Sequence, residues 1–205
     1  MKIAVIQPHY DDAAFSVGEL MLDRLSRGDQ ITIVTVFGGI PPMGVDGPVN
    51  PHFVKWDILS REHASVCRTF GFEEISLSHL DDAARGGAEV DDEALRSDLR
   101  QLLVGTGFDQ WWVPVGIHHP DHIDVRLCCR WIGRPTERYM LYEELPYRVL
   151  YPADLEMRGY HRMVGYDPKW LAEKKTMVRM YASQLREGVE AERCLWVPER
   201  LWEAL

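Results

Sequence analysis

Short apolar runs alternate with amphipathic stretches along most of the chain. This alternation is typical of βαβ units, in which helices cover a sheet of parallel strands. Lys2 to Gln7 predicts the first strand. Ile31 to Phe37 predicts a second strand that is buried on both faces, because it is β-branched and almost continuously apolar. We therefore expect an α/β fold: a three-layer αβα sandwich around a mostly parallel, Rossmann-like sheet.

The same alternation predicts the later elements. Further strands are expected at Ile75 to Leu77, Trp111 to Val115 and Arg138 to Tyr142. Helices are expected from about Ala14 to Gly28, Val54 to Phe70, Asp91 to Leu103 and through Cys128 to Trp131, with a last long helix from Asp167-Pro168 through Leu185. The Gly- and Pro-rich segment from Gly38 to Pro51 predicts a long loop, because neither a helix nor a central strand accommodates it.

Length and composition narrow the class of protein. The 205 residues fit one domain, residues 1–205, that is large enough to bury a substantial core. The net charge of −9 disfavours nucleic acid and anionic membrane surfaces as partners. The chain has no apolar run of the roughly 18 residues that a membrane span needs, and its first apolar stretch is too short for a signal peptide. We expect a cytoplasmic protein whose four cysteines are reduced and mostly buried.

Two polar clusters directly follow predicted strands. The first runs from His9 to Asp12, and the second runs from His118 to His122. In open α/β sheets the carboxyl ends of the parallel strands form the crevice in which ligands bind. We therefore expect the two clusters to converge at one edge of the sheet.

The residue types in the two clusters are those of a catalytic metal site. Catalytic zinc takes three imidazole or carboxylate ligands and keeps a fourth position for water. A His/Asp pair from one cluster and a His from the other meet that count. A remaining carboxylate can then act on the water, and another imidazole can supply a proton or stabilise an oxyanion. If Asp12 points to the metal, Asp11 projects in another direction, over the water.

Each acidic residue also has a structural interpretation. Asp11, Asp12 or Asp121 at the start of a helix commonly caps free backbone N–H groups. The coincidence of two such clusters, each after an apolar strand, favours a shared metal site.

The motifs Pro8-His9-Tyr10-Asp11-Asp12 with Phe15 to Gly18, and His119-Pro120-Asp121-His122, resemble the PIG-L/LmbE family of zinc-dependent N-acetyl sugar deacetylases. The resemblance covers most of the chain, including Arg61 to Ala64, Tyr142 to Tyr147 and Tyr181 to Gln184. Within the family the chain is most similar to deacetylases of actinobacterial antibiotic assembly, which act on N-acetylglucosaminyl pseudoaglycones.

The resemblance implies a ligand set and a base. His9, Asp12 and His122 would bind zinc, although ferrous iron also accepts these ligands. Asp11 would be the general base. The substrate would be a small-molecule N-acetyl amino-sugar conjugate, and the products would be acetate and a free amine.

The resemblance also assigns roles to the remaining motif residues. His119 would protonate the leaving amine or stabilise the tetrahedral oxyanion, and Asp121 would orient the His119 imidazole. The chain departs from the family pattern at Tyr10, where proline is usual, and at Ala13, where glutamate is usual. Neither position is a metal ligand in the family, so we expect metal binding to be retained.

Substrate-binding residues are also carried over from the resemblance. Segments that border the sugar site in the family contain Arg61, Asp81 and Arg85, while Glu143 and Tyr147 follow a strand end and could wall the pocket. The loop from Gly38 to Pro51 is expected to contact the part of the substrate beyond the acetamide.

Two other functions fit the same residues. A metal-dependent esterase or phosphoesterase could use these ligands on another electrophile. A non-catalytic sugar-binding homologue is suggested by Tyr10 and Ala13. A nucleotide-dependent oxidoreductase is disfavoured, because the first strand is not followed by a G-x-G-x-x-G run.

Overall fold

The computed structural model describes residues 1–41, 51–132, 139–151, 160–163, 168–185, 195 and 197–204. In these residues seven strands form one sheet in the order β3-β2-β1-β4-β5-β7-β6. The first five strands of that order pair in parallel, and β7 runs antiparallel to both β5 and β6. The strands are β1 (Lys2–Gln7), β2 (Gln30–Thr35), β3 (Glu73–Ser76), β4 (Gln110–Pro114), β5 (Tyr139–Tyr142), β6 (Tyr160–Met163) and β7 (Leu201–Ala204).

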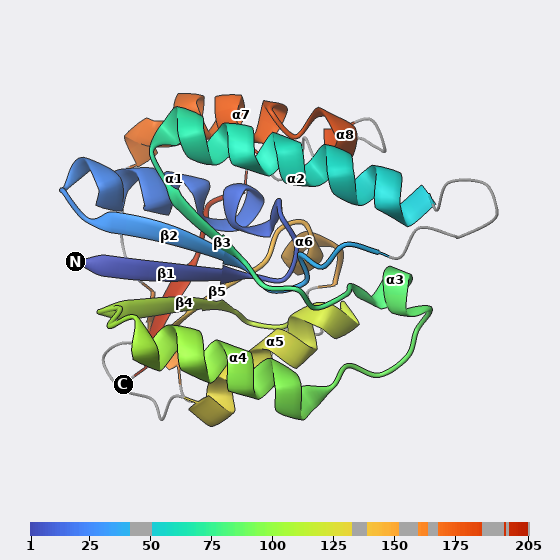
Figure 1. Ribbon diagram of the computed structural model, residues 1–205. Helices are drawn as coiled ribbons and strands as arrows, with labels where there is room; N and C mark the ends of the chain where they lie inside the picture. The colour runs from blue at the N-terminus through green and yellow to red at the C-terminus, as the bar shows by residue number, and fades with distance from the viewer. Residues whose placement is uncertain are drawn as a thin grey trace.

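Helices cover both faces of the sheet, so the expected three-layer αβα architecture is confirmed (Figure 1). One face is covered by α1 (Asp12–Ser26), α2 (Pro51–Phe70) and α7 (Leu171–Arg179), with α8 (Ala182–Leu185) at its end. The other face is covered by α4 (Asp92–Gly105) and α5 (Pro120–Ile132). Three short helices, α3 (Asp82–Arg85), α6 (Tyr147–Leu150) and the 3-10 helix η2 (Pro168–Trp170), complete the described elements.

The core lies in two layers, one on each side of the sheet. Alternate residues of β1 point to opposite faces: Ile3 and Val5 join the core under α1, α2 and α7, whereas Ala4 and Ile6 join the core under α4 and α5. Because both faces are buried, the strand is apolar at successive positions rather than at every second one. This is the reason that the sequence pattern of β1 and β2 predicted central strands.

The order of strands reverses at β1. The chain passes from β1 to β2 and β3 on one side, then returns to β4 on the other side of β1. Val5 lies opposite Trp112 in the parallel pairing of β1 with β4. This reversal creates a crevice beyond the carboxyl ends of β1 and β4, which is the usual ligand site of such a sheet.

The prediction of one continuous last helix is wrong. The chain forms η2, α7 and α8 instead, and the helix is interrupted between α7 and α8 at Met180 and Tyr181. At the break the N–H of Tyr181 donates to the carbonyl of Val178, three residues back rather than four. The tighter turn places the fully buried Tyr181 ring beside Phe15 of α1. Asp167 lies outside the described residues.

Several other sequence expectations have a clear outcome. Cys67, Cys128 and Cys129 are free and buried, as expected, and Cys194 lies outside the described residues. Of the predicted Gly38 to Pro51 loop, positions 42–50 also lie outside the described residues.

None of the described helices is both long and apolar enough to cross a membrane.

Helix α1 is bent near its middle, and a buried carboxylate stabilises the bend. Val17 has non-helical backbone angles, so the next N–H groups lose their helical acceptors. The Glu199 carboxylate accepts hydrogen bonds from the backbone N–H groups of Glu19 and Leu20, each at 2.9 Å. The Lys174 ammonium lies 2.6 Å from the same carboxylate, and both side chains are buried. The segment before β7 thus ties α7 to α1.

We predict that Glu199→Ala lowers the free energy of unfolding by about 3 to 5 kcal/mol, because Lys174 is left as an unpaired buried charge. Chemical denaturation measures the loss, and Glu89→Ala, at an exposed position, serves as the matched control. Adding Lys174→Met to Glu199→Ala should recover part of the loss. Equal stability of the Glu199 and Glu89 variants would contradict the assignment.

Candidate metal centre

The first cluster lies in the tight connection between β1 and α1. Asp12 begins α1, and its carboxylate accepts a hydrogen bond from the backbone N–H of His9 at 2.8 Å. The Gln7 side chain accepts from the N–H of Ala13 at 3.0 Å, so the end of β1 caps the first turn. Asp11 occupies the N-cap position but makes no side-chain capping bond. The two aspartates are therefore not used as helix caps.

The second cluster follows β4 in an equally constrained loop. The Glu144 carboxylate accepts hydrogen bonds from three successive backbone N–H groups, those of Val115, Gly116 and Ile117, at 2.7 to 3.0 Å. His118 has a φ of 65°, in the left-handed region that residues other than glycine seldom adopt. These constraints turn the chain so that α5 begins at Pro120, with the following aspartate and histidine fully buried.

Three side chains from the two clusters form the candidate metal site. The Asp12 Oδ2 atom lies 3.4 Å from His9 Nδ1 and 3.4 Å from His122 Nε2. The three ligand atoms all lie within 4.8 Å of one another. Two imidazole nitrogens and one carboxylate oxygen match the ligands of a catalytic divalent-metal site.

Hydrogen bonding supports this assignment at His122. Its Nδ1 lies 3.3 Å from the Glu144 carboxylate, which acts as the acceptor and leaves Nε2 without a proton. His122 Nε2 is buried and has no hydrogen-bond partner among the described residues. A buried polar atom without a partner is costly, and a metal ion would satisfy it.

Asp121 holds the other histidine. Its carboxylate lies 2.8 Å from His9 Nε2 and 2.9 Å from the Arg85 guanidinium, and it accepts from the N–H of Asp82 at 3.0 Å. Burial opposes ionisation of Asp121, but the hydrogen bonds and the charge of His9 outweigh it and lower the pKa of Asp121 to about 2. Asp121 and Glu144 thus each hold the remote nitrogen of one candidate ligand.

The expected role of Asp121 requires a correction. Its carboxylate, which the family resemblance predicts to orient His119, instead contacts His9. Asp121 contacts His119 through its backbone, whose N–H donates to His119 Nδ1 at 3.2 Å. The backbone, and not the carboxylate, therefore orients the imidazole.

This backbone hydrogen bond determines the protonation of His119. Because Nδ1 accepts a hydrogen bond from a backbone N–H, the proton of the neutral ring is on Nε2. Burial, together with the nearby His9 and His122, lowers the pKa of His119 to about 4. His119 is therefore neutral at physiological pH and offers an N–H donor.

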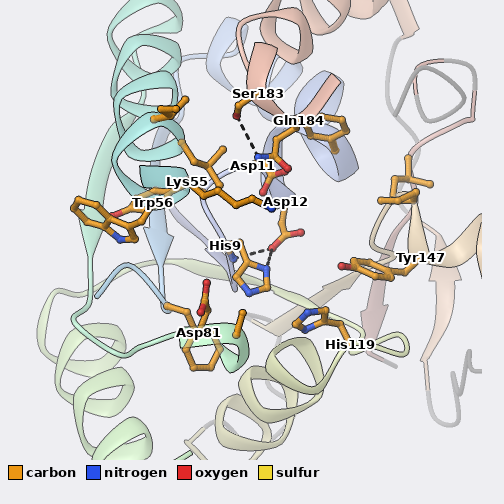
Figure 2. A pocket seen from close by; sticks show the side chains of 18 residues that line it. His9, Asp11, Asp12, Lys55, Trp56, Asp81, His119, Tyr147, Ser183 and Gln184 are labelled. Atoms are coloured by element: carbon orange, nitrogen blue, oxygen red, sulfur yellow. Dashed lines mark hydrogen bonds and ion pairs between the residues drawn. The ribbon is translucent and has the colours of Figure 1, made fainter. Parts of the chain in front are cut away.

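Two of the candidate ligands, His9 and Asp12, line a cavity of about 640 Å³, and His122 is buried behind them (Figure 2). Figure 2 shows Lys55 and Trp56 on one side, Asp81 below His9, and Tyr147 beyond His119. The cavity wall combines acidic, apolar and aromatic side chains with one lysine. They come from helices α1, α2, α3, α6 and α8 and from the loops after β1, β2, β3, β4 and β5. They are His9, Tyr10, Asp11, Asp12, Phe15, Phe37, Lys55, Trp56, Ile58, Leu59, Asp81, Ala83, His119, Leu145, Pro146, Tyr147, Ser183 and Gln184.

Asp11 lines this cavity beside the metal ligands. Burial and the adjacent Asp12 carboxylate raise the pKa of Asp11 to about 7, against the opposing influence of His9 and His122. A carboxylate with a pKa near neutrality both takes up and releases a proton at physiological pH.

Of the five expected substrate residues, Asp81 and Tyr147 line the cavity. Arg61, Arg85 and Glu143 are not among its lining residues. Arg61 is exposed on α2 and pairs with Asp57 one turn away, and Arg85 is engaged by Asp121. Asp81 also caps α3 by accepting from the N–H of Ala84 at 2.6 Å, so its carboxylate has a structural partner.

Glu143 and Glu144 have roles that the sequence did not separate. Glu143 is fully buried and points toward Arg148, Arg200 and Trp202, away from the cavity. Glu144, its neighbour, holds His122 and the loop after β4. The residue that supports the candidate metal centre is therefore Glu144, and not Glu143, the residue predicted from the sequence to wall the pocket. Both follow β5 directly, and nothing in the sequence indicates which of them turns toward the metal centre.

Other cavity residues were also missed. Lys55 and Trp56 come from the first turns of α2, and Ser183 and Gln184 come from α8. The Glu62 carboxylate accepts from both the N–H and the hydroxyl of Ser183, at 2.9 and 2.6 Å, and so holds α8 at the rim. The family resemblance at Tyr181 to Gln184 covers Ser183 and Gln184, whereas no sequence motif singles out Lys55 and Trp56.

Comparisons with known proteins agree with this fold. Neither a protein-family model nor a curated protein sequence matches the chain. Among solved structures, it is similar to a deacetylase of the teicoplanin biosynthesis pathway, at 18% identity and a TM-score of 0.80, with 98% of this chain and 97% of that chain covered.

Two further structures extend the comparison. The A40926 pseudoaglycone deacetylase is 19% identical with a TM-score of 0.75, and 99% of this chain and 96% of that one are covered. The N,N'-diacetylchitobiose deacetylase from Pyrococcus horikoshii is 17% identical with a TM-score of 0.65, and coverage is 90% and 70%. The chain therefore has the fold of these deacetylases.

We predict that Asp121→Asn weakens Zn²⁺ affinity by about 10- to 100-fold, because the substitution removes the charged acceptor on His9. Competition with a chromophoric chelator measures the affinity. Asp124→Asn, on the same helix but without a contact to His9, is the matched control. If both variants bind Zn²⁺ equally well, Asp121 does not support the ligand.

Proposed function

We propose that this protein is a metal-dependent hydrolase that removes an N-acetyl group from an amino sugar or glycoconjugate. The observation that carries the proposal is the His9, Asp12 and His122 cluster, which opens onto a cavity lined by Asp11 and His119. The comparison structures support the proposal, because they are deacetylases of the same fold.

The metal is proposed to be zinc, with ferrous iron as the other ion suited to this donor set. His9, Asp12 and His122 would hold it, with Asp121 and Glu144 behind the two imidazoles. The bound ion would supply Lewis acidity and lower the pKa of water. Proton transfer and stabilisation of the oxyanion are proposed to be carried out by side chains of the protein.

Asp11 is proposed to move the proton. Its carboxylate accepts a proton from the water that attacks the acetyl carbonyl carbon, forming a tetrahedral intermediate. As the C–N bond breaks, Asp11 returns that proton to the nitrogen, so acetate and a free amine leave. The raised pKa of Asp11, about 7, suits a group that performs both transfers.

His119 is proposed to stabilise the developing oxyanion by donation from Nε2–H. A neutral imidazole that already accepts at Nδ1 would become an imidazolate if it gave up the Nε2 proton. Of the two roles expected from the sequence, oxyanion stabilisation therefore fits His119 better than protonation of the amine.

The cavity wall favours a particular substrate class. Lys55 is the only lysine or arginine among the described residues that line the cavity, so its wall has no cluster of cations that would suit a phosphoester. Phe15, Leu59 and Leu145 add an apolar wall close to the candidate base. We propose a neutral or cationic acetamido sugar attached to an apolar group, processed in the cytoplasm during antibiotic biosynthesis.

The proposal predicts acetate release from acetamido-sugar conjugates by the Zn²⁺- or Fe²⁺-loaded protein. Enzymatic measurement of acetate, with mass spectrometry of the amine product, tests it on a panel that includes N-acetylglucosaminyl glycopeptides. The matching O-acetyl and phosphate esters are the comparison substrates. Metal-loaded protein that releases acetate from none of the acetamido sugars would overturn the proposal.

Asp11→Asn is expected to lower kcat by about 10²- to 10⁴-fold, because the amide cannot accept the proton of the attacking water. The metal content should stay stoichiometric, since Asp11 does not belong to the ligand cluster. Asp57→Asn, on the exposed face of α2, is the control. Near-full activity of Asp11→Asn would exclude Asp11 as the base.

A further inference from the structure

A second group of potential metal ligands lies at the end of α2, on the far side of Tyr10 from the candidate metal centre. It consists of His63, Cys67 and Glu74, whose ligand atoms all lie within 4.8 Å of one another. His63 Nε2 is 3.5 Å from Cys67 Sγ and 3.8 Å from a Glu74 carboxylate oxygen. None of these residues belongs to the cluster on which the proposed deacetylation depends.

The local fold brings the three side chains together over a short stretch of sequence. His63 and Cys67 are one turn apart on α2, and this i, i+4 spacing places both on one helix face, as in the paired ligands of helical zinc motifs. The chain then turns at Gly71 and enters β3, where Glu74 faces the same site. Little chain entropy is lost in forming such a local site.

Hydrogen bonding leaves His63 in the form that binds metals. The Tyr181 hydroxyl donates to the carbonyl of Tyr10 at 2.9 Å, so its oxygen accepts a hydrogen bond from the Nδ1–H of His63, also at 2.9 Å. His63 Nε2 then carries a lone pair, directed toward Cys67 and Glu74. Burial lowers the pKa of His63 to about 4, so the ring is neutral at physiological pH.

Burial also distinguishes the three ligands. His63 and Cys67 are almost fully buried, whereas the Glu74 side chain is 46% exposed. An ion can therefore reach the site past Glu74, and the thiol proton can leave by the same route. Thiolate and imidazole together select Zn²⁺ and similar soft ions over Mg²⁺ or Ca²⁺.

We propose that His63, Cys67 and Glu74 form a second metal site, which binds Zn²⁺ or another soft divalent ion. Binding forms bonds from the ion to His63 Nε2, Cys67 Sγ and a Glu74 oxygen, and releases the Cys67 proton to solvent. Water completes a tetrahedral set of ligands. Tyr181 holds the remote nitrogen of His63, as Asp121 and Glu144 hold those of His9 and His122.

The second site is linked to the loop of the candidate metal centre. A metal on Nε2 makes the Nδ1–H of His63 a stronger donor to Tyr181, and the Tyr181 hydroxyl donates to Tyr10, between His9 and Asp11. Hydrogen bonds therefore connect the second site to the segment that carries one candidate metal ligand and the proposed base.

Cobalt substitution tests the site with a signal that the other cluster cannot produce. The metal-free full-length protein is titrated with Co²⁺ under reducing conditions, and the near-ultraviolet sulfur-to-cobalt charge-transfer band is recorded. His9, Asp12 and His122 contain no thiol, so the band reports a thiolate site alone. We expect the band in the wild-type protein and, undiminished, in His122→Ala.

Variants assign the band to its ligands. Cys67→Ser should abolish it, and Cys129→Ser, a buried cysteine outside the cluster, should retain it. Glu74→Gln, at an exposed position, should shift the titration to higher Co²⁺ concentration without disturbing the core, which circular dichroism checks. Absence of the band in the folded wild-type protein at saturating Co²⁺, or its persistence in Cys67→Ser, would overturn the proposal.

Discussion

The parallel pairing of β1 with β4 is the contact on which the candidate metal centre depends. The two clusters are separated by more than a hundred residues, and they meet because Val5 lies opposite Trp112 in this pairing. The first cluster begins two residues after β1, and the three residues between β4 and the second cluster are held by hydrogen bonds to Glu144. The register of the strands therefore carries over to the candidate ligands. A shift of one residue would exchange the faces to which the side chains point.

Buried carboxylates then orient the histidines that the strands bring together. Asp121 and Glu144 are fully buried. The Asp121 carboxylate is hydrogen-bonded to His9 Nε2, and the Glu144 carboxylate is hydrogen-bonded to His122 Nδ1. In each histidine this is the nitrogen remote from the candidate metal position. Burial of a charge is costly unless it is paired or hydrogen-bonded. Asp121 has the Arg85 guanidinium, and Glu144 has three backbone N–H groups. The second site at His63 repeats this arrangement with a tyrosine hydroxyl as the partner.

The sequence predicted the five parallel strands and the main helices, since their apolar periodicity reflects burial on one or both faces. It did not predict β6 and β7, the two strands that extend the sheet in antiparallel pairing. It was less informative where long-range contacts override local preference. The last helix breaks at Tyr181, because the buried ring and hydroxyl have partners on α1, α2 and the loop after β1. The bend of α1 at Val17 depends on Glu199, a residue more than 170 positions away, which local pattern cannot reveal.

For the site, the sequence alone determined which residue types follow β1 and β4 and that both clusters lie at the carboxyl edge of the sheet. Strand polarity and short connections suffice for that conclusion. Only the tertiary structure decided the partner of each side chain. The Asp121 carboxylate contacts His9, and Glu144, rather than Glu143, contacts His122. Arg85 pairs with Asp121 and does not line the cavity. The reason is physical: a side chain's role depends on the direction in which it leaves the backbone and on what is packed there, and neither is encoded by spacing along the chain.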